Sequence, residues 1–275
     1  MLKKIIETSG FNAVVKGRYG YIVYNKNDIY VGKSIEAYGE FSEFEVEIFN
    51  QVCTAGDIVV EVGANIGTHT LVLSKLVGPQ GRVYAFEPQR IVFQNLCANM
   101  SINSISNVEC HQMAVSGKEG FILLPDIRYD VEGNFGGVEI DKFQTGQKVP
   151  AVTLDDFLEI PCLKLLKIDV EGMEVDVIQG AKTIIETHKP IIYIENDRSE
   201  KSKDLIEIIR SLNYRMFWHL PPLFNPNNFA GNKTDIHPGI VSVNMLCLHH
   251  SIHPDLNGFS EVIDSGFHPM KKTDI

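Results

Sequence analysis

The sequence predicts an α/β fold in which a mostly parallel sheet is covered by helices on both faces. Between residues 57 and 248, short apolar runs alternate with segments that have the apolar spacing of helices. Most of the runs are apolar at successive positions, which is typical of strands buried on both faces. Four of them end in a carboxylate, at Glu61, Glu87, Asp169 and Glu195. Because ligands of such sheets bind beyond the carboxyl ends of the strands, these acids predict where the site lies.

The elements of this main domain, which we place at residues 51–248, are bounded by local signals in the sequence. Glycine, proline or a carboxylate closes most of them, as Gly78-Pro79 does after the first helix. We expect strands at 57–62, 82–86, 107–112, 163–168, 190–194, 214–219 and 242–248. We expect helices at 68–77, 89–101, 174–187 and 203–212.

Three segments fall outside this alternation. Residues 1–50 are expected to form an N-terminal extension, with a hairpin around 21–24 and an amphipathic helix over the apolar positions of 41–49. Residues 113–150 have little apolar periodicity and several glycines, so we expect an insertion or a lid-like hairpin over the site. Residues 249–275 are expected to form an irregular C-terminal tail.

The composition excludes several classes of protein. The formal net charge of −10 argues against sequence-independent binding of nucleic acid, which requires Lys and Arg to neutralise phosphates. No apolar run approaches the roughly 18 residues that a transmembrane helix needs, and the N-terminus lacks the pattern of a signal peptide. The five cysteines are widely spaced and form no C-x-x-C pair, as is typical of free thiols in a reducing compartment. We therefore expect a cytoplasmic protein without a nucleic-acid partner.

The loop Glu61-Val62-Gly63-Ala64-Asn65-Ile66-Gly67 follows a predicted strand and opens a predicted helix. Gly63 and Gly67 have no Cβ, so the backbone can turn tightly there and approach a ligand closely. The free amides at the start of the following helix suit a carboxylate or a phosphate. The loop is therefore built to contact a ligand.

The spacing of the glycines distinguishes between possible ligands. A dinucleotide-binding loop has the form G-x-G-x-x-G, but Asn65 stands where that pattern requires its second glycine. A phosphate-cradling loop continues with Lys and Ser or Thr, whereas Gly67 is followed by Thr68 and His69. The form E-x-G-x-x-x-G instead matches the first motif of enzymes that use S-adenosylmethionine. In such a site, Glu61 can face the amino group of the methionine moiety.

Glu87 lies 26 positions after Glu61 (87 − 61) and ends the second strand of the domain. An acid at this place can accept hydrogen bonds from both hydroxyls of a ribose, in NAD and in S-adenosylmethionine alike. Two alternatives therefore remain beside a methyltransferase. One is an NAD-dependent oxidoreductase, against which the missing G-x-G-x-x-G pattern counts, and the other is a module that binds the cofactor without catalysis.

The most distinctive block is Lys167-Ile168-Asp169-Val170-Glu171-Gly172, followed by Glu174. Together with other motifs of the chain, this block resembles the FkbM family of methyltransferases over roughly residues 38–248. The other motifs are Val62-Gly63-Ala64-Asn65-Ile66-Gly67, Phe86-Glu87-Pro88 and Thr153-Leu154-Asp155-Asp156.

The resemblance implies a Rossmann-like class I methyltransferase fold, with a seven-stranded sheet whose last strand is reversed. It also implies S-adenosylmethionine as donor, S-adenosylhomocysteine as product, and usually transfer to a hydroxyl of a sugar or secondary metabolite. By resemblance, Ala114-Val115 should lie near the adenine and Gly39-Glu40 should close over the cofactor. The expected cofactor contacts are Glu40, Glu61, Gly63, Ala64, Asn65, Gly67, Thr68, His69, Glu87, Pro88, Ala114, Val115 and Asp169.

Methyl transfer needs alignment of the reacting atoms and removal of the hydroxyl proton. Our hypothesis is that Asp169 or Glu171 positions or deprotonates the acceptor hydroxyl. His219, at the end of another strand, is a weaker alternative, because a base of near-neutral pKa suits this task. Asp169 and Glu171, with Glu195 and Asp197, also have the hard oxygen ligands that Mg²⁺ prefers, although we predict no metal.

The acceptor itself is not identified by the sequence. The loop 221–229 mixes aromatic and amide side chains, which suit a sugar or another polyhydroxylated molecule. We therefore expect Phe224 and Asn228 of this loop, with Glu195, to contact a small-molecule or glycan acceptor.

Overall fold

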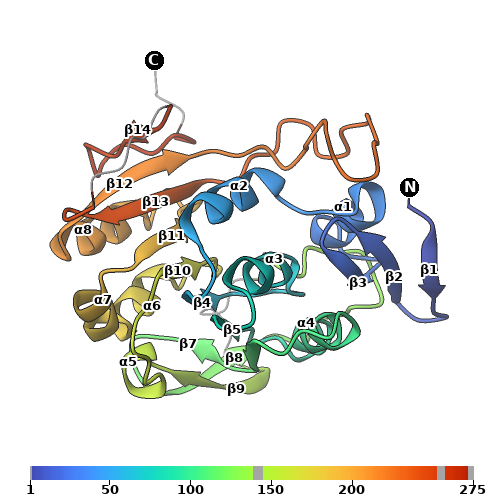
Figure 1. The fold of residues 1–275 in the computed structure, drawn as a ribbon, viewed down its shortest axis with the longest axis horizontal. Coiled ribbons are helices and arrows are strands. Elements are labelled where there is room, and N and C mark those ends of the chain that lie inside the picture. The colour runs from blue at the N-terminus through green and yellow to red at the C-terminus, as the bar shows by residue number, and fades with distance from the viewer. Residues whose placement is uncertain (1, 139–144, 253–257, 272–275) are drawn as a thin grey trace.

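The computed structural model describes residues 2–138, 145–252 and 258–271. Within them, the largest sheet has eight strands, and the other two sheets have three each (Figure 1). In spatial order, the large sheet consists of β14 (Ser260–Glu261), β12 (Tyr214–His219), β13 (Asn244–His249), β11 (Ile191–Glu195), β10 (Leu165–Ile168), β4 (Ile58–Val62), β5 (Arg82–Phe86) and β6 (Val108–His111).

The pairing of these strands confirms the predicted topology. β4, β5, β6, β10 and β11 pair in parallel, whereas β13 runs antiparallel to both β11 and β12. β13 is the last of the seven predicted strands along the chain, so the last strand is reversed as expected. The eighth strand, β14, comes from the C-terminal tail and extends the edge of the sheet beside β12. A strand of two residues has no periodicity by which the sequence could reveal it.

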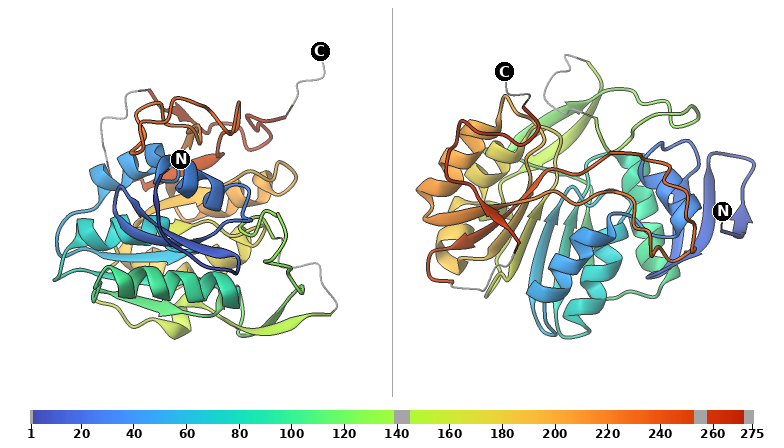
Figure 2. Two further views of the ribbon diagram at one scale, coloured as in Figure 1. Left: turned by 90° about the vertical axis from the view of Figure 1, so that its right-hand side faces the viewer. Right: turned by 90° about the horizontal axis from the view of Figure 1, so that it is seen from above.

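Helices cover both faces of the large sheet (Figure 2). On one face, α2 (Glu43–Val52) and α3 (Thr68–Val77) bury their apolar sides against the sheet, with α4 (Arg90–Ile102) beside them. On the other face, α6 (Glu174–Gly180), α7 (Lys182–His188) and α8 (Ser202–Ser211) do the same. In the described part of the chain, no helix is both long enough and apolar enough to cross a lipid bilayer.

The single helix predicted at 174–187 is two helices in the structure, because the chain breaks at Ala181. The short helix α5 (Leu154–Phe157) explains the break. Asp155 of α5 accepts hydrogen bonds from the backbone N–H groups of Thr183 and Ile184, both at 2.8 Å. A carboxylate that accepts hydrogen bonds from these free amides stabilises the start of a new helix. Residues 174–187 alone do not reveal this partner, which lies elsewhere in the sequence.

The N-terminal extension contains more structure than the predicted hairpin and helix. β1 (Lys4–Glu7), β2 (Asn12–Gly17) and β3 (Gly20–Asn25) form an antiparallel sheet, and α1 (Val31–Tyr38) precedes α2. Asn99 of α4 joins this sheet to the main domain. Its amide pairs with both backbone groups of Val23, at 2.6 and 3.0 Å, and also donates to the carbonyl of Ile66 at 2.7 Å.

The segment 113–150 contributes a small sheet of its own. β7 (Ala114–Val115), β9 (Gln147–Val152) and β8 (Gly120–Leu124) pair in that order. Val115, Leu124 and Val149 are buried in the core below the main sheet, so the segment carries more core than its weak periodicity indicates. After β8, the residues Asn134, Gly136 and Gly137 lie beside the glycine loop at the carboxyl ends of β4 and β5.

Candidate active site

A cavity of about 270 Å³ lies at the carboxyl ends of β4, β5, β10 and β11. Ten of the residues predicted for the site line it, namely Glu61, Gly63, Ala64, Asn65, Thr68, His69, Glu87, Asp169, Glu171 and Glu195. The structure therefore brings the four strand-end acids and most of the glycine loop to one place. Other parts of the chain that are far apart in sequence add to the lining, among them Tyr30, Gln89, Asn134 and Asn244.

The glycine loop depends on Gly63. Its φ of +83° lies in the left-handed region, which favours glycine. A Cβ at this position would lie 1.8 Å from the backbone carbonyl oxygen of Asp169. The missing side chain therefore lets the ends of β4 and β10 come together, and the hydrogen bond from the Asp169 N–H to the carbonyl of Val62, at 2.9 Å, fixes them.

Glu87 is held by the backbone of the loop and of the following helix start. Its two carboxylate oxygens accept hydrogen bonds from the N–H groups of Asn65 at 3.0 Å and Gln89 at 2.8 Å. Burial raises the pKa of Glu87 to about 7, although these two amides favour the charged form. Each oxygen keeps a further lone pair for a hydroxyl donor in the cavity.

Glu61 is completely buried at the floor of the cavity. Its Oε2 accepts a hydrogen bond from the Thr70 hydroxyl at 2.6 Å. Its Oε1 has no hydrogen-bond partner among the described residues, although the Lys167 Nζ lies 3.6 Å away. Burial raises the pKa of Glu61 and the charge of Lys167 opposes that change. An unsatisfied buried carboxylate oxygen is costly, so it marks a place where a ligand can donate a hydrogen bond.

Asp169 and Lys167 form an ion pair across the rim of the cavity, with Nζ and Oδ2 3.1 Å apart. The Asp169 side chain is 40% exposed, whereas that of Lys167 is only 2% exposed. Lys167 is a residue of the site that was not predicted from the sequence. The sequence does mark this residue, because it places a lysine inside an otherwise apolar strand that is buried from water.

Three further carboxylates gather beside Asp169. Oxygens of Glu171, Glu195 and Asp197 lie within 4.8 Å of one another, close enough to hold a divalent cation. Arg198 pairs with Glu171, and burial raises the pKa of Glu171 to about 8. Burial and the charge of Asp169 also raise the pKa of Glu195. This end of the cavity is therefore strongly acidic.

His219 does not line the cavity, contrary to its predicted place as an alternative base. Its Nδ1 lies 2.8 Å from the hydroxyl of Tyr193, which also accepts a hydrogen bond from Asn244 at 2.9 Å. Burial lowers the pKa of His219 to about 4. The near-neutral pKa that motivated the prediction is therefore not present.

Glu40 also lies outside the lining, where it is fully engaged with protein groups. It accepts hydrogen bonds from Arg18 at 2.7 Å, from Asn225 at 2.8 Å and from the N–H of Phe229 at 2.7 Å. These bonds tie the loop 221–229 to the N-terminal extension. Glu40 thus fastens two segments of the protein together and has no free oxygen facing the cavity.

The remaining predicted residues lie around the cavity rather than in it. Pro88, Ala114 and Val115 line a narrow crevice of about 10 Å³ behind the glycine loop. Gly67 adopts a left-handed conformation, with φ of +84°, at the start of α3. In the loop 221–229, the Phe224 ring packs on Tyr38 with centroids 5.5 Å apart, and buried Asn228 bonds to its own loop.

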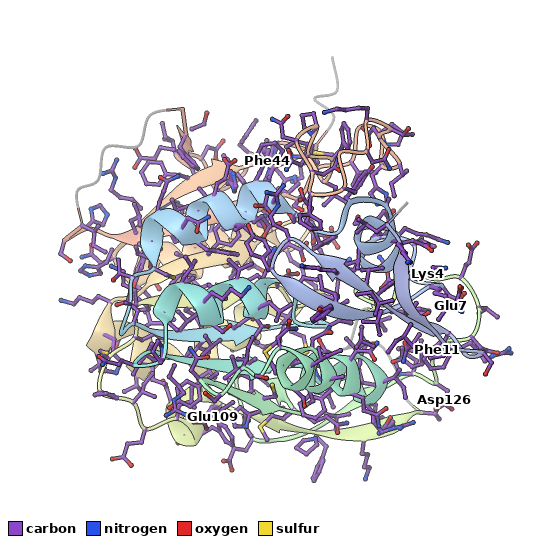
Figure 3. The ribbon with its side chains drawn as sticks, turned by 45° about the vertical axis from the view of Figure 1, so that its right-hand side comes forward. Lys4, Glu7, Phe11, Phe44, Glu109 and Asp126 are labelled. Atoms are coloured by element: carbon purple, nitrogen blue, oxygen red, sulfur yellow. The ribbon has the colours of Figure 1, made fainter. Side chains whose placement is uncertain are left out.

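A second cavity, of about 330 Å³, lies between the start of α4 and the end of β8. Phe11 and Asp126, which line it, are both labelled in Figure 3. Gln89 separates it from the first cavity, because this side chain contributes to both linings. It contains none of the strand-end acids.

The comparisons with known proteins agree with the motifs. Methyltransferase 1 of Beauveria bassiana is 33% identical over 144 residues, which cover 44% of this chain and 57% of that protein. Hexuronic acid methyltransferase AglP of Haloferax volcanii is 26% identical over 153 residues, covering 56% and 61%. The chain thus spans about three fifths of the length of these relatives.

A methyltransferase FkbM structure from Methylobacillus flagellatus is 20% identical, covers 74% of this chain and 50% of the other, and has a TM-score of 0.48. The family model described as the methyltransferase FkbM domain matches residues 61–216, from the strand-end Glu61 into β12. This match covers more than half of the chain, and the chain belongs to the FkbM methyltransferase domain family.

Proposed function

We propose that this chain transfers a methyl group from S-adenosylmethionine to a hydroxyl oxygen of a sugar, glycan or secondary metabolite. The convergence of Glu61, Glu87 and Asp169 on one cavity, beside the glycine loop, carries the proposal. The family match and the methyltransferase relatives support it. The five unpaired cysteines support the cytoplasm as its setting.

The residues of the cavity fit the donor. Glu87 would accept hydrogen bonds from the ribose hydroxyls, and the unsatisfied Oε1 of Glu61 would accept one from the amino group of the methionine moiety. The absence of a Cβ at Gly63 lets the end of β10 lie against the glycine loop, which holds Asp169 beside the donor site. When bound, S-adenosylmethionine supplies an electrophilic methyl group on a sulfonium.

On the acceptor side, Asp169 is the best-placed group to receive the hydroxyl proton. One of its oxygens is held by Lys167 and its side chain remains partly exposed to the cavity. The Glu171 carboxylate is instead paired with Arg198. We therefore assign Glu171 to orienting the acceptor and not to removing its proton. Proton removal by a positioned base contributes about 10² to 10⁴ in rate, so Asp169 would account for a substantial part of the acceleration.

The acidity of the cavity bears on the class of acceptor. Glu171, Glu195 and Asp197 lie within 4.8 Å of one another and already raise one another's pKa, so a free carboxylate on the acceptor would add a further negative charge that this cluster disfavours. The Haloferax volcanii relative is named for hexuronic acids, so charged sugars belong in any test. We propose that neutral hydroxyl acceptors are preferred over uronic acids.

The proposal is tested by incubating the protein with methyl-tritiated S-adenosylmethionine and a panel of neutral sugars, uronic acids and hydroxylated secondary metabolites. Transfer of label to a hydroxyl, located by mass spectrometry, is the expected result. Binding of the cofactor without transfer to any member would favour the non-catalytic alternative. Transfer to uronic acids alone would contradict the proposed acceptor preference while leaving methyl transfer in place.

A further inference from the structure

β10 is a short strand whose four residues are all buried, and one of them is a lysine. Burying an ammonium group is costly unless it is paired, so the partners of Lys167 must repay that cost. The strand register provides them. Lys167 is the direct neighbour of Glu61 on β4 and of Tyr193 on β11, and these three side chains share the face covered by α2 and α3.

Lys167 is surrounded by carboxylates from three parts of the chain. Its Nζ lies 3.1 Å from Oδ2 of Asp169 and 3.6 Å from Oε1 of Glu61, and Glu45 of α2 is a third carboxyl group nearby. Burial lowers the pKa of Lys167, but these carboxylates outweigh burial and hold it above the ordinary value. The ammonium is therefore charged at neutral pH.

Lys167 is also the only Lys or Arg that lines the cavity within the described ranges. It shares the lining with the acids Glu45, Glu61, Glu87, Asp169, Glu171, Glu195 and Asp197. Of these, Glu61 is both completely buried and left with an oxygen free of hydrogen bonds. A cation beside such a carboxylate favours its ionised form, which burial alone disfavours.

We infer that Lys167 is a positioning residue, which keeps Glu61 charged and aimed at the cavity so that Glu61 can bind the amino group of the cofactor. This inference rests on the proposed function. Lys167 itself needs no contact with the donor, because it acts through Glu61. The charge of Asp169 depends less on Lys167, because water solvates the exposed part of the Asp169 side chain.

Other groups that face Lys167 fit this role. His69 of α3 is uncharged, because burial and the neighbouring Lys167 lower its pKa well below the ordinary value. Tyr193 is neutral, because burial raises its pKa. Glu45 bonds to the Ser42 hydroxyl at 2.6 Å, and burial raises its pKa to about 7. Glu61 thus has no cation other than Lys167 within this cluster of described residues.

Calorimetric titration with two ligands tests the inference on the full chain. S-adenosylhomocysteine carries the amino group, whereas 5′-methylthioadenosine lacks the amino-acid end. For Lys167→Met, we expect S-adenosylhomocysteine affinity at pH 7 to fall at least about tenfold, as when a charged hydrogen bond is lost. Methylthioadenosine affinity should stay within about twofold. Lys164→Met, immediately before the start of the same strand, is the matched control and should change neither.

The pH dependence separates positioning from a merely structural role. In Lys167→Met, Glu61 loses its cation, so its pKa rises and S-adenosylhomocysteine should bind more tightly at pH 8.5 than at pH 6.5. The wild type should show a smaller change over this range. Equal weakening of both ligands at every pH would overturn the inference.

If Lys167→Met folds poorly, a second comparison still tests the inference. In the Glu61→Gln background the negative charge of Glu61 is already gone. Adding Lys167→Met should therefore change S-adenosylhomocysteine affinity by no more than about twofold. A further tenfold loss would overturn the inference. Failure of the wild type to bind either ligand would instead defeat the proposed function, whereas full binding by Lys167→Met would defeat only the role of Lys167.

Discussion

Glu61 and Asp169 differ in their access to solvent, and this difference indicates different roles for the two carboxylates. Glu61 is completely buried beneath the cavity, whereas the Asp169 side chain is 40% exposed at its rim. A buried carboxylate with a free oxygen suits a fixed contact to a ligand. A partly exposed carboxylate can pass a proton on to solvent, which a base must do in each turnover.

Replacing Asp169 by Asn tests the role of the base. The amide keeps the shape of the side chain but cannot accept the hydroxyl proton, so we expect turnover to fall by about 10² or more. Affinity for S-adenosylhomocysteine should change by less than about threefold. The measurement pairs steady-state kinetics on any acceptor found in the panel with calorimetry. Unchanged turnover with unchanged cofactor affinity would show that Asp169 is not the base.

Gly63 is the residue whose replacement should harm the loop most. Gly63→Ala places a Cβ 1.8 Å from the Asp169 carbonyl oxygen and also strains a backbone with φ of +83°. Gly56→Ala is the matched control, because Gly56 has a φ of +93° but open space around its missing Cβ. We expect chemical denaturation to show a loss of about 1 kcal/mol for Gly56→Ala and at least about 3 kcal/mol for Gly63→Ala. Equal losses would mean that the close approach of the two strands is unimportant.

Glu87 should make stability depend on pH. Its pKa is raised from 4.5 in the unfolded chain to about 7 in the fold, so the folded state binds its proton more tightly. The resulting stabilisation is present below pH 4.5 and is lost as the pH rises through 7, with a maximum of about 3 kcal/mol. Glu87→Gln should therefore lose less stability than the wild type between pH 5 and pH 8 in urea denaturation. Parallel curves for the two proteins would contradict this assignment.

At the scale of the elements, the strands and helices of the main domain follow from local sequence. The apolar run at 57–62 became β4 and the helical spacing at 68–77 became α3, because burial and capping signals lie within these segments. The break at Ala181 could not be predicted, since the Asp155 carboxylate that caps α7 comes from another element.

The same limit applies to the candidate site. The strand-end acids could be predicted because position at the end of a parallel strand is a local property. The pairing of Lys167 with Glu61 depends on the strand register, and the place of Asn244 in the lining depends on the reversed strand. His219 ends β12 at the predicted edge of the sheet, but its contact with Tyr193 of another strand depends on tertiary packing that local sequence does not reveal.

The junction between α4 and the N-terminal sheet rests on Asn99. This buried amide makes hydrogen bonds to Val23 and to Ile66 of the glycine loop, so it couples the extension to the site. Asn99→Ala leaves these buried backbone groups unpaired, and we expect a loss of about 2 to 3 kcal/mol in thermal or chemical unfolding. Asn103→Ala, which removes similar bonds to Tyr21 nearer the surface, should cost about 1 kcal/mol. A smaller loss for Asn99→Ala than for Asn103→Ala would contradict the coupling.

At the scale of the whole molecule, the cavity is assembled from parts that are far apart in the chain. The N-terminal extension contributes Tyr30, the strand ends contribute the acids, the segment after β8 contributes Asn134, and the reversed strand contributes Asn244. All of them meet at the carboxyl edge of the large sheet, where ligands of such folds bind. The overall fold therefore locates the site, and the individual side chains decide which ligand it takes.

The most direct test that the cavity binds S-adenosylmethionine is calorimetric titration of the full chain with S-adenosylhomocysteine and, separately, with NAD. We predict saturable binding of S-adenosylhomocysteine, none of NAD at the same concentration, and about tenfold weaker S-adenosylhomocysteine binding by Glu61→Gln. Binding of NAD in preference to S-adenosylhomocysteine, or binding that is indifferent to Glu61, would contradict it.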